Sequence, residues 1–203
     1  MNKEKEQKRV LSSKKTEEGL SYSVEVRDKE GRVIQRVSAP SRSYVRAWNQ
    51  LLNVQFKYST DTSIVMTNGN PGSIGYHENN LNCNAAAGIV LYGLRVGKGF
   101  TAVDITDYAL ETPCGEGVGV DEFNHQITAF TLPAVVGTTC SFTIKRILIN
   151  NSGATISAIR EIGMYIRLEL VWYALGFRDV LPGGVTVPHG GSITVTYTIP
   201  VTV

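Results

Sequence analysis

The sequence predicts a mainly β fold, an antiparallel β-sandwich of the jelly-roll kind, and three observations carry this prediction. Apolar side chains occupy every odd position from Ile193 to Val203, while threonine or proline occupies the even positions. Side chains of a strand alternate between its two faces, so this segment has one apolar and one polar face. Other short β-branched runs are separated by turn signals. The 20 glycines and the 8% of aromatic residues also suit turn-rich β structure.

Length and composition are those of a folded chain with a hydrophobic core. The 203 residues, 42% of them hydrophobic, suffice for one β domain with an appendage. No apolar run approaches the roughly 18 residues that a membrane-spanning helix needs. The first nine residues are mostly charged and no apolar segment follows them, so we expect neither a secretory signal nor a membrane partner.

The three cysteines predict free thiols. Cys83, Cys114 and Cys140 lie far apart in the sequence, and no Cys-x-x-Cys motif is present. An odd number of widely spaced cysteines favours buried thiols, and a disulfide or an intermolecular bridge is the alternative.

Charge is distributed unevenly along the chain. Residues 1–58 contain 13 Lys and Arg against 7 Asp and Glu, a net charge of +6. Residues 59–203 contain 7 against 11, a net charge of −4. A basic front half on an acidic body favours docking of one copy onto another, although two solvated surfaces without a partner would show the same pattern.

The chain divides into three predicted segments. Residues 1–19 are rich in Lys and Glu and cannot bury enough surface to order alone, so they predict a flexible charged arm, with a short helix as the alternative. Residues 20–58 predict a β-hairpin followed by an amphipathic helix, and residues 59–203 predict the sandwich. In the hairpin, the alternating run 22–27 meets the run 32–37 at a turn in which Gly31 can adopt positive φ.

The helix is predicted to begin after Pro40, with Ser41 as its N-cap. Aromatic and aliphatic side chains recur at three- and four-residue steps and predict an apolar face that covers the sheet or a neighbouring subunit. Basic and aromatic groups on one helix also suit nucleic-acid binding, but here the bases lie opposite the apolar stripe, so nucleic acid is not the expected partner. The candidate interface residues on this segment are Arg42, Tyr44, Arg46, Trp48, Leu52 and Phe56.

Further strands and two loops complete the predicted body. The loops 59–82 and 112–122 are the candidates for contact with a variable partner, because binding residues favour long irregular segments. The predicted strands cover residues 63–66, 89–96, 123–132, 139–150, 158–168, 170–178 and 185–187.

No motif predicts catalysis or a cofactor. The run from Gly93 to Gly99 lacks the first glycine and the final Ser or Thr of a phosphate-binding loop. The three histidines are scattered without metal-ligand spacing. The carboxylates Asp104, Asp107 and Glu111 lie close in sequence but lack a calcium-loop pattern. We therefore predict no catalytic, cofactor or metal site and no small-molecule substrate.

Two stretches resemble a known group of proteins. One contains Asn150-Asn151-Ser152-Gly153 and Glu161-Ile162-Gly163-Met164-Tyr165. The other contains Arg178-Asp179-Val180-Leu181, Val187-Pro188 and Thr194-Val195-Thr196-Tyr197-Thr198-Ile199. Together they are similar to the C-terminal part of virion structural proteins of tailed bacteriophages. The chain differs in having Met164 where Leu is usual and in an insertion at residues 158–160.

The resemblance implies a non-enzymatic part of a virus particle, associated with its head or tail and found in the virion after assembly in the host cytoplasm. The implied partners are copies of the same chain and other virion proteins. The alternative is a tail-tip or fibre-type module that binds a receptor or glycan through the two loops 59–82 and 112–122.

Overall fold

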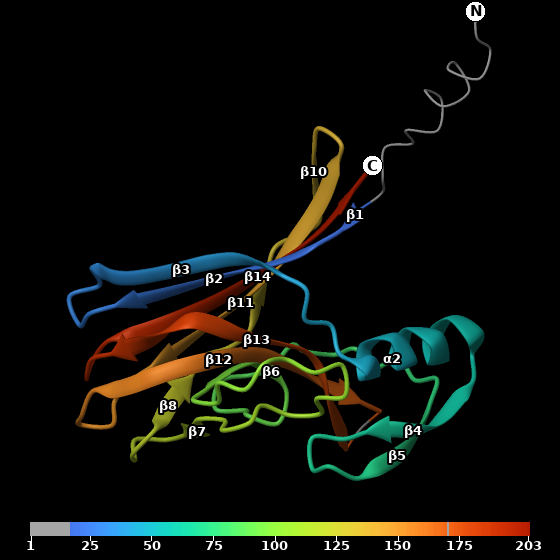
Figure 1. Cartoon of the computed structure of the whole chain (residues 1–203), viewed down its shortest axis with the longest axis horizontal. Coiled ribbons are helices and arrows are strands. Elements are labelled where there is room, and N and C mark those ends of the chain that lie inside the picture. Colours follow the sequence, from blue (N-terminus) through green and yellow to red (C-terminus); the bar gives the residue numbers. More distant parts are fainter. Residues whose placement is uncertain (1–16, 170) are drawn as a thin grey trace, which may run out of the picture.

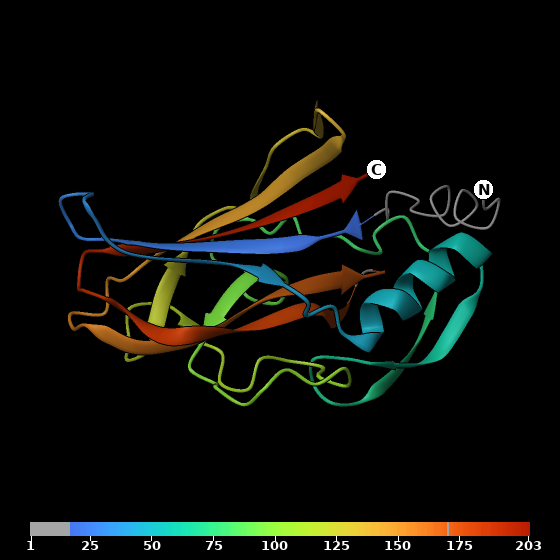
Figure 2. The same ribbon diagram turned by 45° about the horizontal axis from the view of Figure 1, so that its top comes forward.

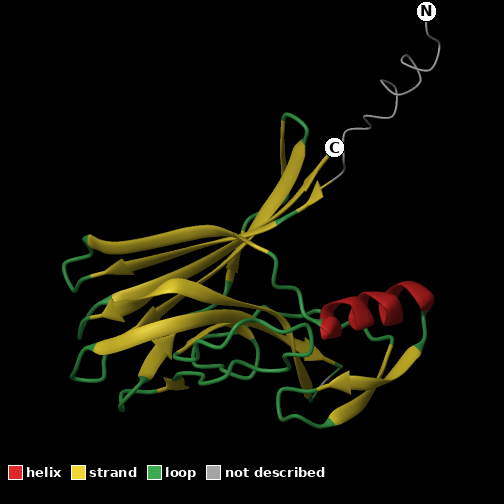
Figure 3. Cartoon of the chain, in the orientation of Figure 1, coloured by secondary structure: helices red, strands yellow, loops and turns green. Residues whose placement is uncertain are grey.

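The computed structural model describes residues 17–169 and 171–203 as a two-layered β-sandwich with one helix at its end (Figures 1 and 3). The predicted mainly β, antiparallel sandwich is confirmed. Most of the predicted N-terminal arm, residues 1–16, lies outside the described residues. Among the residues that are described, no helix is long and apolar enough to cross a membrane.

The larger sheet follows the order β3-β2-β14-β11-β8-β7, with β1 beside β14 and with β9 and β10 beside β11. Its pairs are antiparallel except for the short parallel pair of β7 and β8. Its strands are β1 (Glu17–Glu18), β2 (Leu20–Arg27), β3 (Val33–Ser41), β7 (Gly115–Glu116), β8 (Glu122–His125), β9 (Ala129–Phe130), β10 (Ala134–Val136), β11 (Thr139–Ile149) and β14 (Ser192–Thr202).

Strand β14 lies in the middle of the larger sheet. It pairs with β11 along its whole length and with β2 from Ser192 to Thr198. Ile193, Val195 and Tyr197 are buried, as the alternating pattern predicts. The most regular strand of the sequence is therefore the one that joins the hairpin to the rest of the sandwich.

The smaller sheet has the order β13-β12-β6 and faces the larger one (Figures 1 and 2). Its strands are β6 (Gly93–Gly97), β12 (Ile156–Leu168) and β13 (Trp172–Val187). The ring of Phe177 meets the ring of Tyr197 across the two layers, with centroids 4.5 Å apart. In β12 the residues 161–166 are all buried, because loops cover the face that points away from the larger sheet.

The predicted hairpin is confirmed as β2 and β3. Gly31 has φ +81° in the connecting turn, the conformation that favours glycine, and its N–H donates to the Asp28 carbonyl at 3.0 Å. The hairpin is not a separate layer, since β2 pairs with β14 and adds two strands to the larger sheet.

The predicted helix is present as α2 (Arg46–Lys57), but the prediction of its N-cap is wrong. Ser41 ends β3, and Val45 occupies the cap position without a capping side chain. The Ser41 hydroxyl instead donates to the buried carboxylate of Asp179 at 2.8 Å. This tertiary contact keeps Ser41 in the extended chain, where a local sequence signal would have started a helix.

The predicted apolar stripe of this segment, which consists of Tyr44, Trp48, Leu51, Leu52 and Phe56 with Val45 beside it, is buried only in part: Val45 and Leu51 are buried, and Tyr44 and Trp48 pack against the core. Ala47, Leu51 and Val54 are buried, whereas Phe56 is 86% exposed and Leu52 only half-buried. The helix packs between β13 and a separate hairpin, β4 (Thr60–Val65) and β5 (Pro71–Gly75), as seen in Figure 1. Contact with β13 and β4 therefore buries the side of the helix that carries Ala47, Leu51 and Val54, and it leaves Phe56 in solvent.

Three predicted strands differ from the observed ones. Residues 89–92 form a loop, so only the second half of the predicted strand 89–96 exists, as β6. The run 123–132 is interrupted at residues 126–128. The buried guanidinium of Arg146 donates hydrogen bonds to the carbonyls of Ala86, Ile89 and Gln126. These carbonyls are therefore not used in strand pairing. Strand β13 continues through Pro182 to residue 187, where two separate runs were predicted.

Candidate functional site

The larger sheet extends past the smaller sheet at one end. Figures 1 and 2 show β10, the start of β11, the end of β14 and β1 projecting beyond the sandwich. We call residues 132–142 and 199–203, together with β1, the sheet extension. Its strand order is β10-β11-β14-β1, and it is continuous with the larger sheet through β11 and β14.

The sheet extension prolongs the apolar inner face of the sandwich into solvent. Cys140 pairs with Val201 on one side and with Val135 on the other, so these three side chains share a face. Ile144 and Tyr197 lie on the same face, each four residues further along its strand, where the smaller sheet buries them. Val135 is 73% exposed, because the smaller sheet ends before it.

The outer edge of the sheet extension is unpaired. Strand β10 pairs with β11 on one side, and no strand lies on its other side in the part of the chain that the structure describes. Its residues 134–136 carry no charge and no proline, the usual devices that protect an edge. Val136 and Leu132 are 79% and 87% exposed. An uncharged free edge beside an exposed apolar face is the geometry of a strand-pairing or sheet-packing contact.

The interface residues predicted on the helix segment do not form one surface. The rings of Tyr44 and Trp48 stack at 5.0 Å and both lie against Phe177, so they pack inside the molecule. Arg42 and Arg46 are exposed. Leu52 is half-buried, and Phe56 points to solvent. Their role in an interface stays a prediction.

A second exposed apolar group lies after the helix. Tyr58 and Tyr76 are exposed and their ring centroids are 4.5 Å apart, and the exposed Phe56 is two residues from Tyr58. Tyr76 belongs to the predicted receptor loop 59–82, which contains the β4–β5 hairpin. An exposed pair of aromatic rings is a platform of the kind on which a sugar or another ring can stack.

A buried ionic cluster surrounds Arg178 of β13. Its Nε donates to Glu161 at 2.9 Å and its Nη1 to Asp107 at 2.9 Å, while Nη2 lies 3.5 Å from Glu111. Arg178 and Glu161 are almost fully buried. The hydrogen bonds and charges of Glu161 and Asp107 outweigh burial and raise the pKa of the Arg178 guanidinium. Two of the three carboxylates that stand close together in the sequence, Asp107 and Glu111, thus meet one guanidinium, whereas Asp104 bonds locally to Thr106.

The Glu161 carboxylate is saturated with donors. Its Oε1 accepts the N–H groups of Gly99 and Thr112, at 2.9 and 2.7 Å, and its Oε2 accepts the N–H of Glu111 and the Nε of Arg178. These four donors join the carboxylate to both ends of the loop 98–112 and to β13. The cluster therefore anchors the loop 98–112 to the outer face of the smaller sheet. A cavity of about 390 Å³ beside it is lined by Asp107, Glu111 and Arg178.

A second buried cluster joins the hairpin to the smaller sheet. Oδ2 of Asp179 accepts the hydroxyls of Ser41, Ser43 and Tyr197, each at 2.8 Å. Burial raises the pKa of Asp179, and burial together with this carboxylate raises that of Tyr197 well above its ordinary value. The cluster connects β3, β13 and β14.

Arg146 of β11 is fully buried and is held by carbonyl oxygens. Its guanidinium donates to Gln126, Leu94, Ala86 and Ile89 at 2.6 to 3.2 Å. Burial, with a contribution from Arg95, lowers its pKa to about 10. Sequence reasoning missed this residue, although a signal exists: Arg146 lies at the same strand parity as the core residues Ile144 and Leu148.

His125 is buried beside this arginine. Its Nδ1 lies 2.7 Å from Glu116 Oε2 and 3.1 Å from the Phe123 carbonyl, so Nδ1 carries the proton. Burial, with a contribution from Arg146, lowers the pKa of His125 to about 4 and outweighs the hydrogen bond to Glu116. At neutral pH the contact with Glu116 is a hydrogen bond from a neutral imidazole.

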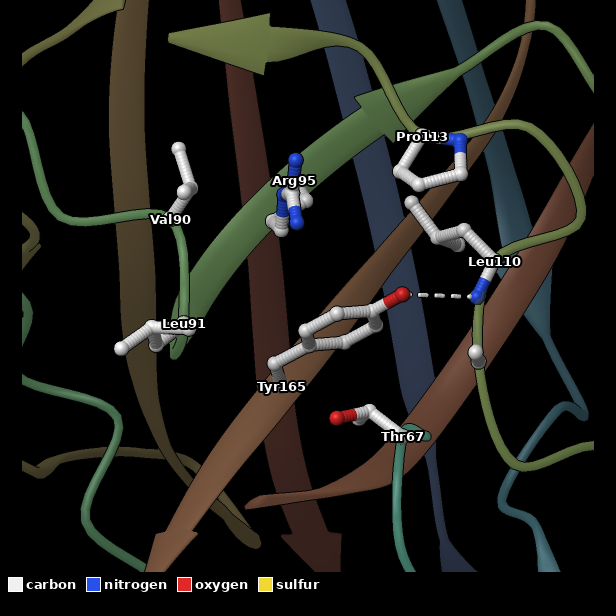
Figure 4. Close-up of a pocket in the computed structure, with 8 residues that line it drawn as sticks. Thr67, Val90, Leu91, Arg95, Leu110, Pro113 and Tyr165 are labelled. Atoms are coloured by element: carbon white, nitrogen blue, oxygen red, sulfur yellow. Dashed lines mark hydrogen bonds between the residues drawn. The ribbon is translucent and has the colours of Figure 1, made fainter. Parts of the chain in front are cut away.

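A pocket of about 280 Å³ opens on the outer face of the smaller sheet and contains Arg95 (Figure 4). Arg95 of β6 and Tyr165 of β12 share this face, with the guanidinium carbon 5.4 Å from the ring centroid. The Tyr165 hydroxyl is hydrogen-bonded to the Leu110 N–H at 2.9 Å. The remaining wall consists of Thr67, Val90, Leu91, Ala109, Leu110 and Pro113.

Metal-binding and redox groups are not gathered in these sites. Within residues 17–169 and 171–203, no cluster of three or more His, Cys, Asp or Glu could hold a metal ion. The cysteines are free thiols, with Cys83 and Cys114 buried and Cys140 exposed on the sheet extension. The prediction of buried free thiols is confirmed for two of the three.

Comparison with known proteins gives no match: neither a protein-family model, nor a curated protein, nor a solved structure is significantly similar to this chain.

Proposed function

We propose that the chain is a non-enzymatic structural subunit of a tailed-phage particle, in its head or tail, and that it assembles through contacts between copies. The observation that carries this proposal is the sheet extension, with its unpaired β10 edge and its exposed apolar face. The resemblance of the segments around Glu161 and Tyr197 to virion structural proteins supplies the biological setting. Repeated copies multiply a weak contact of this kind into a stable assembly.

The occupant proposed for the sheet extension is a second copy of the chain. A symmetric contact places the same patch on both partners, so an edge strand that lacks charge can pair with its own copy. The same arrangement leaves β3, the opposite edge, out of the contact.

Self-association tests the proposal directly. The double variant Val135→Lys, Val201→Lys places two charges on the exposed face of the sheet extension, where neither change disturbs the core. We expect the parent chain to oligomerise with rising concentration in analytical ultracentrifugation and the variant to be at least about tenfold weaker. The matched control is Val118→Lys, Val120→Lys, two exposed valines outside the extension.

The same measurement distinguishes assembly from the alternative function, a receptor- or glycan-binding module. A parent chain that stays monomeric at all concentrations, or a double variant that associates as well as the parent, would contradict assembly through the sheet extension. A monomer would instead favour a receptor- or glycan-binding module, for which the exposed rings of Tyr58 and Tyr76 are the specific observation.

A further inference from the structure

Arg95 is a buried cation without a carboxylate partner. It is 8% exposed, and among the described residues its one hydrogen bond runs from Nη2 to the Cys114 carbonyl. Its Nε is buried and has no acceptor in the described part of the chain. Burial lowers the pKa of the guanidinium, which measures how poorly this site solvates the charge. A buried charge is costly unless it is paired, so the site is electrostatically incomplete.

The other buried arginines show that the fold usually supplies partners. Arg178 is surrounded by three carboxylates, and Arg146 has four carbonyl acceptors within 3.2 Å. Arg95 has neither, and Arg146 adds a second positive charge close enough for the two to perturb each other. The missing acceptor is therefore specific to Arg95.

The pocket beside Arg95 leaves room for a hydrogen-bond acceptor from outside the chain. The pocket of about 280 Å³ that Arg95 lines is partly open to solvent. In Figure 4, Val90 and Leu91 lie on one side of Arg95, and Leu110 and Pro113 lie on the other. Leu91 is exposed at this pocket. The Thr67 hydroxyl is a further polar group on the wall, and most of the remaining lining is apolar.

We propose that the Arg95 pocket binds a carboxylate attached to an apolar body. The guanidinium would donate hydrogen bonds to the carboxylate oxygens and neutralise one negative charge. The Tyr165 ring and the side chains of Leu91 and Pro113 would enclose the apolar body. One cation and a mostly apolar wall match a monoanion better than a phosphate, which would leave a second charge unpaired in an apolar site. The proposal is independent of the assembly function.

The same chemistry can come from a free carboxylic acid or from an acidic side chain of another protein. Two pairs of probes distinguish them: benzoate against benzamide, and N-acetyl-glutamate N-methylamide against its glutamine analogue. We expect at least one acid to bind about tenfold more tightly than its neutral counterpart, followed by ¹H–¹⁵N NMR at the Leu110 amide. Preference for benzoate assigns a free acid, and preference for the capped glutamate assigns a protein-borne carboxylate.

Two variants locate the binding. Arg95→Gln should remove the preference for the acid, while Arg160→Gln, the same change on an exposed arginine of β12, should preserve it. Leu91 is exposed and lies outside the hydrophobic core, so Leu91→Trp should narrow the pocket without unfolding the chain. This variant should bind the acid about tenfold more weakly, and it tests the site even if Arg95→Gln fails to fold. Equal binding of acid and neutral probes, absence of binding by both acids, or binding unchanged in Leu91→Trp would overturn the proposal.

Discussion

At the scale of single residues, charges at apolar-face positions organise this protein. Arg146 lies at a strand position where the pattern predicts a core residue, and its guanidinium donates to the carbonyls of four residues, Ala86, Ile89, Leu94 and Gln126. Four charge-assisted hydrogen bonds offset the cost of burying the guanidinium. Burial, with a smaller contribution from this cation, lowers the pKa of His125 to about 4, so its imidazole is neutral at pH 7.

The neutral state of His125 predicts a pH-dependent stability. Its pKa is about 4 in the folded chain against an ordinary 6.5, so between these values the unfolded chain binds a proton that the folded chain does not. Stability must therefore fall as the pH falls below 6.5. We expect the free energy of unfolding to drop by about 2 kcal/mol between pH 7 and pH 5.

Urea denaturation at pH 7, 6 and 5 measures this loss. The variant His125→Gln should be less stable or equal at pH 7 but should show a much smaller change toward pH 5. Glu116, whose pKa is lowered in the folded chain, contributes a loss only near the acidic end of that range. A pH profile that is the same with and without the histidine would contradict a neutral buried imidazole.

At the scale of elements, helix α2 shows how two neighbours select a face. Its sequence predicts a stripe through Trp48, Leu51, Leu52 and Phe56, and the β4–β5 hairpin and β13 bury Leu51 together with Ala47 and Val54. Trp48 and Leu52 are left half-buried, and Phe56 is left in solvent. Packing against tertiary neighbours therefore outweighs the size of the apolar side chains in deciding the orientation of this helix.

The different burial of Leu51 and Phe56 predicts unequal effects when each side chain is truncated to alanine. Leu51→Ala removes a fully buried side chain and should cost about 2–5 kcal/mol of unfolding free energy. Phe56→Ala removes a larger side chain from solvent and should change stability by less than about 0.5 kcal/mol. Chemical denaturation of both variants gives the comparison, and a larger loss for Phe56→Ala would place Phe56, and not Leu51, against the core.

At the scale of the whole molecule, the two sheets differ in how their outer surfaces are used. Loop 98–112 covers the smaller sheet and is fastened by Glu161 and Arg178. The larger sheet continues past its partner and exposes its inner face at the sheet extension. The smaller sheet is thus covered by a loop of the same chain, whereas part of the inner face of the larger sheet stays exposed.

Loss of the Glu161 charge should loosen the covering loop. In Glu161→Gln an amide N–H₂ would meet N–H donors, and the buried Arg178 would lose its closest ionic partner, so we expect a loss of about 3–5 kcal/mol of unfolding free energy. Hydrogen exchange should accelerate at Gly99 and Thr112, whose N–H groups bind this carboxylate. The exposed Glu78→Gln is the control, and equal stabilities of the two variants would contradict an anchoring role.

The sequence by itself determined the β class, the hairpin, the central strand β14 and the existence of a helix, because alternation and turn residues act over a few neighbours. Burial of Ile193, Val195 and Tyr197 follows directly from that alternation. The tertiary structure decided the start and buried face of α2, the loop that replaces strand 89–92, and the pairing of Arg178 with Glu161. Each of these depends on groups distant in the chain, whose meeting no local period encodes. The exposure of the sheet extension was likewise decided by the tertiary structure, because it depends on where the smaller sheet ends.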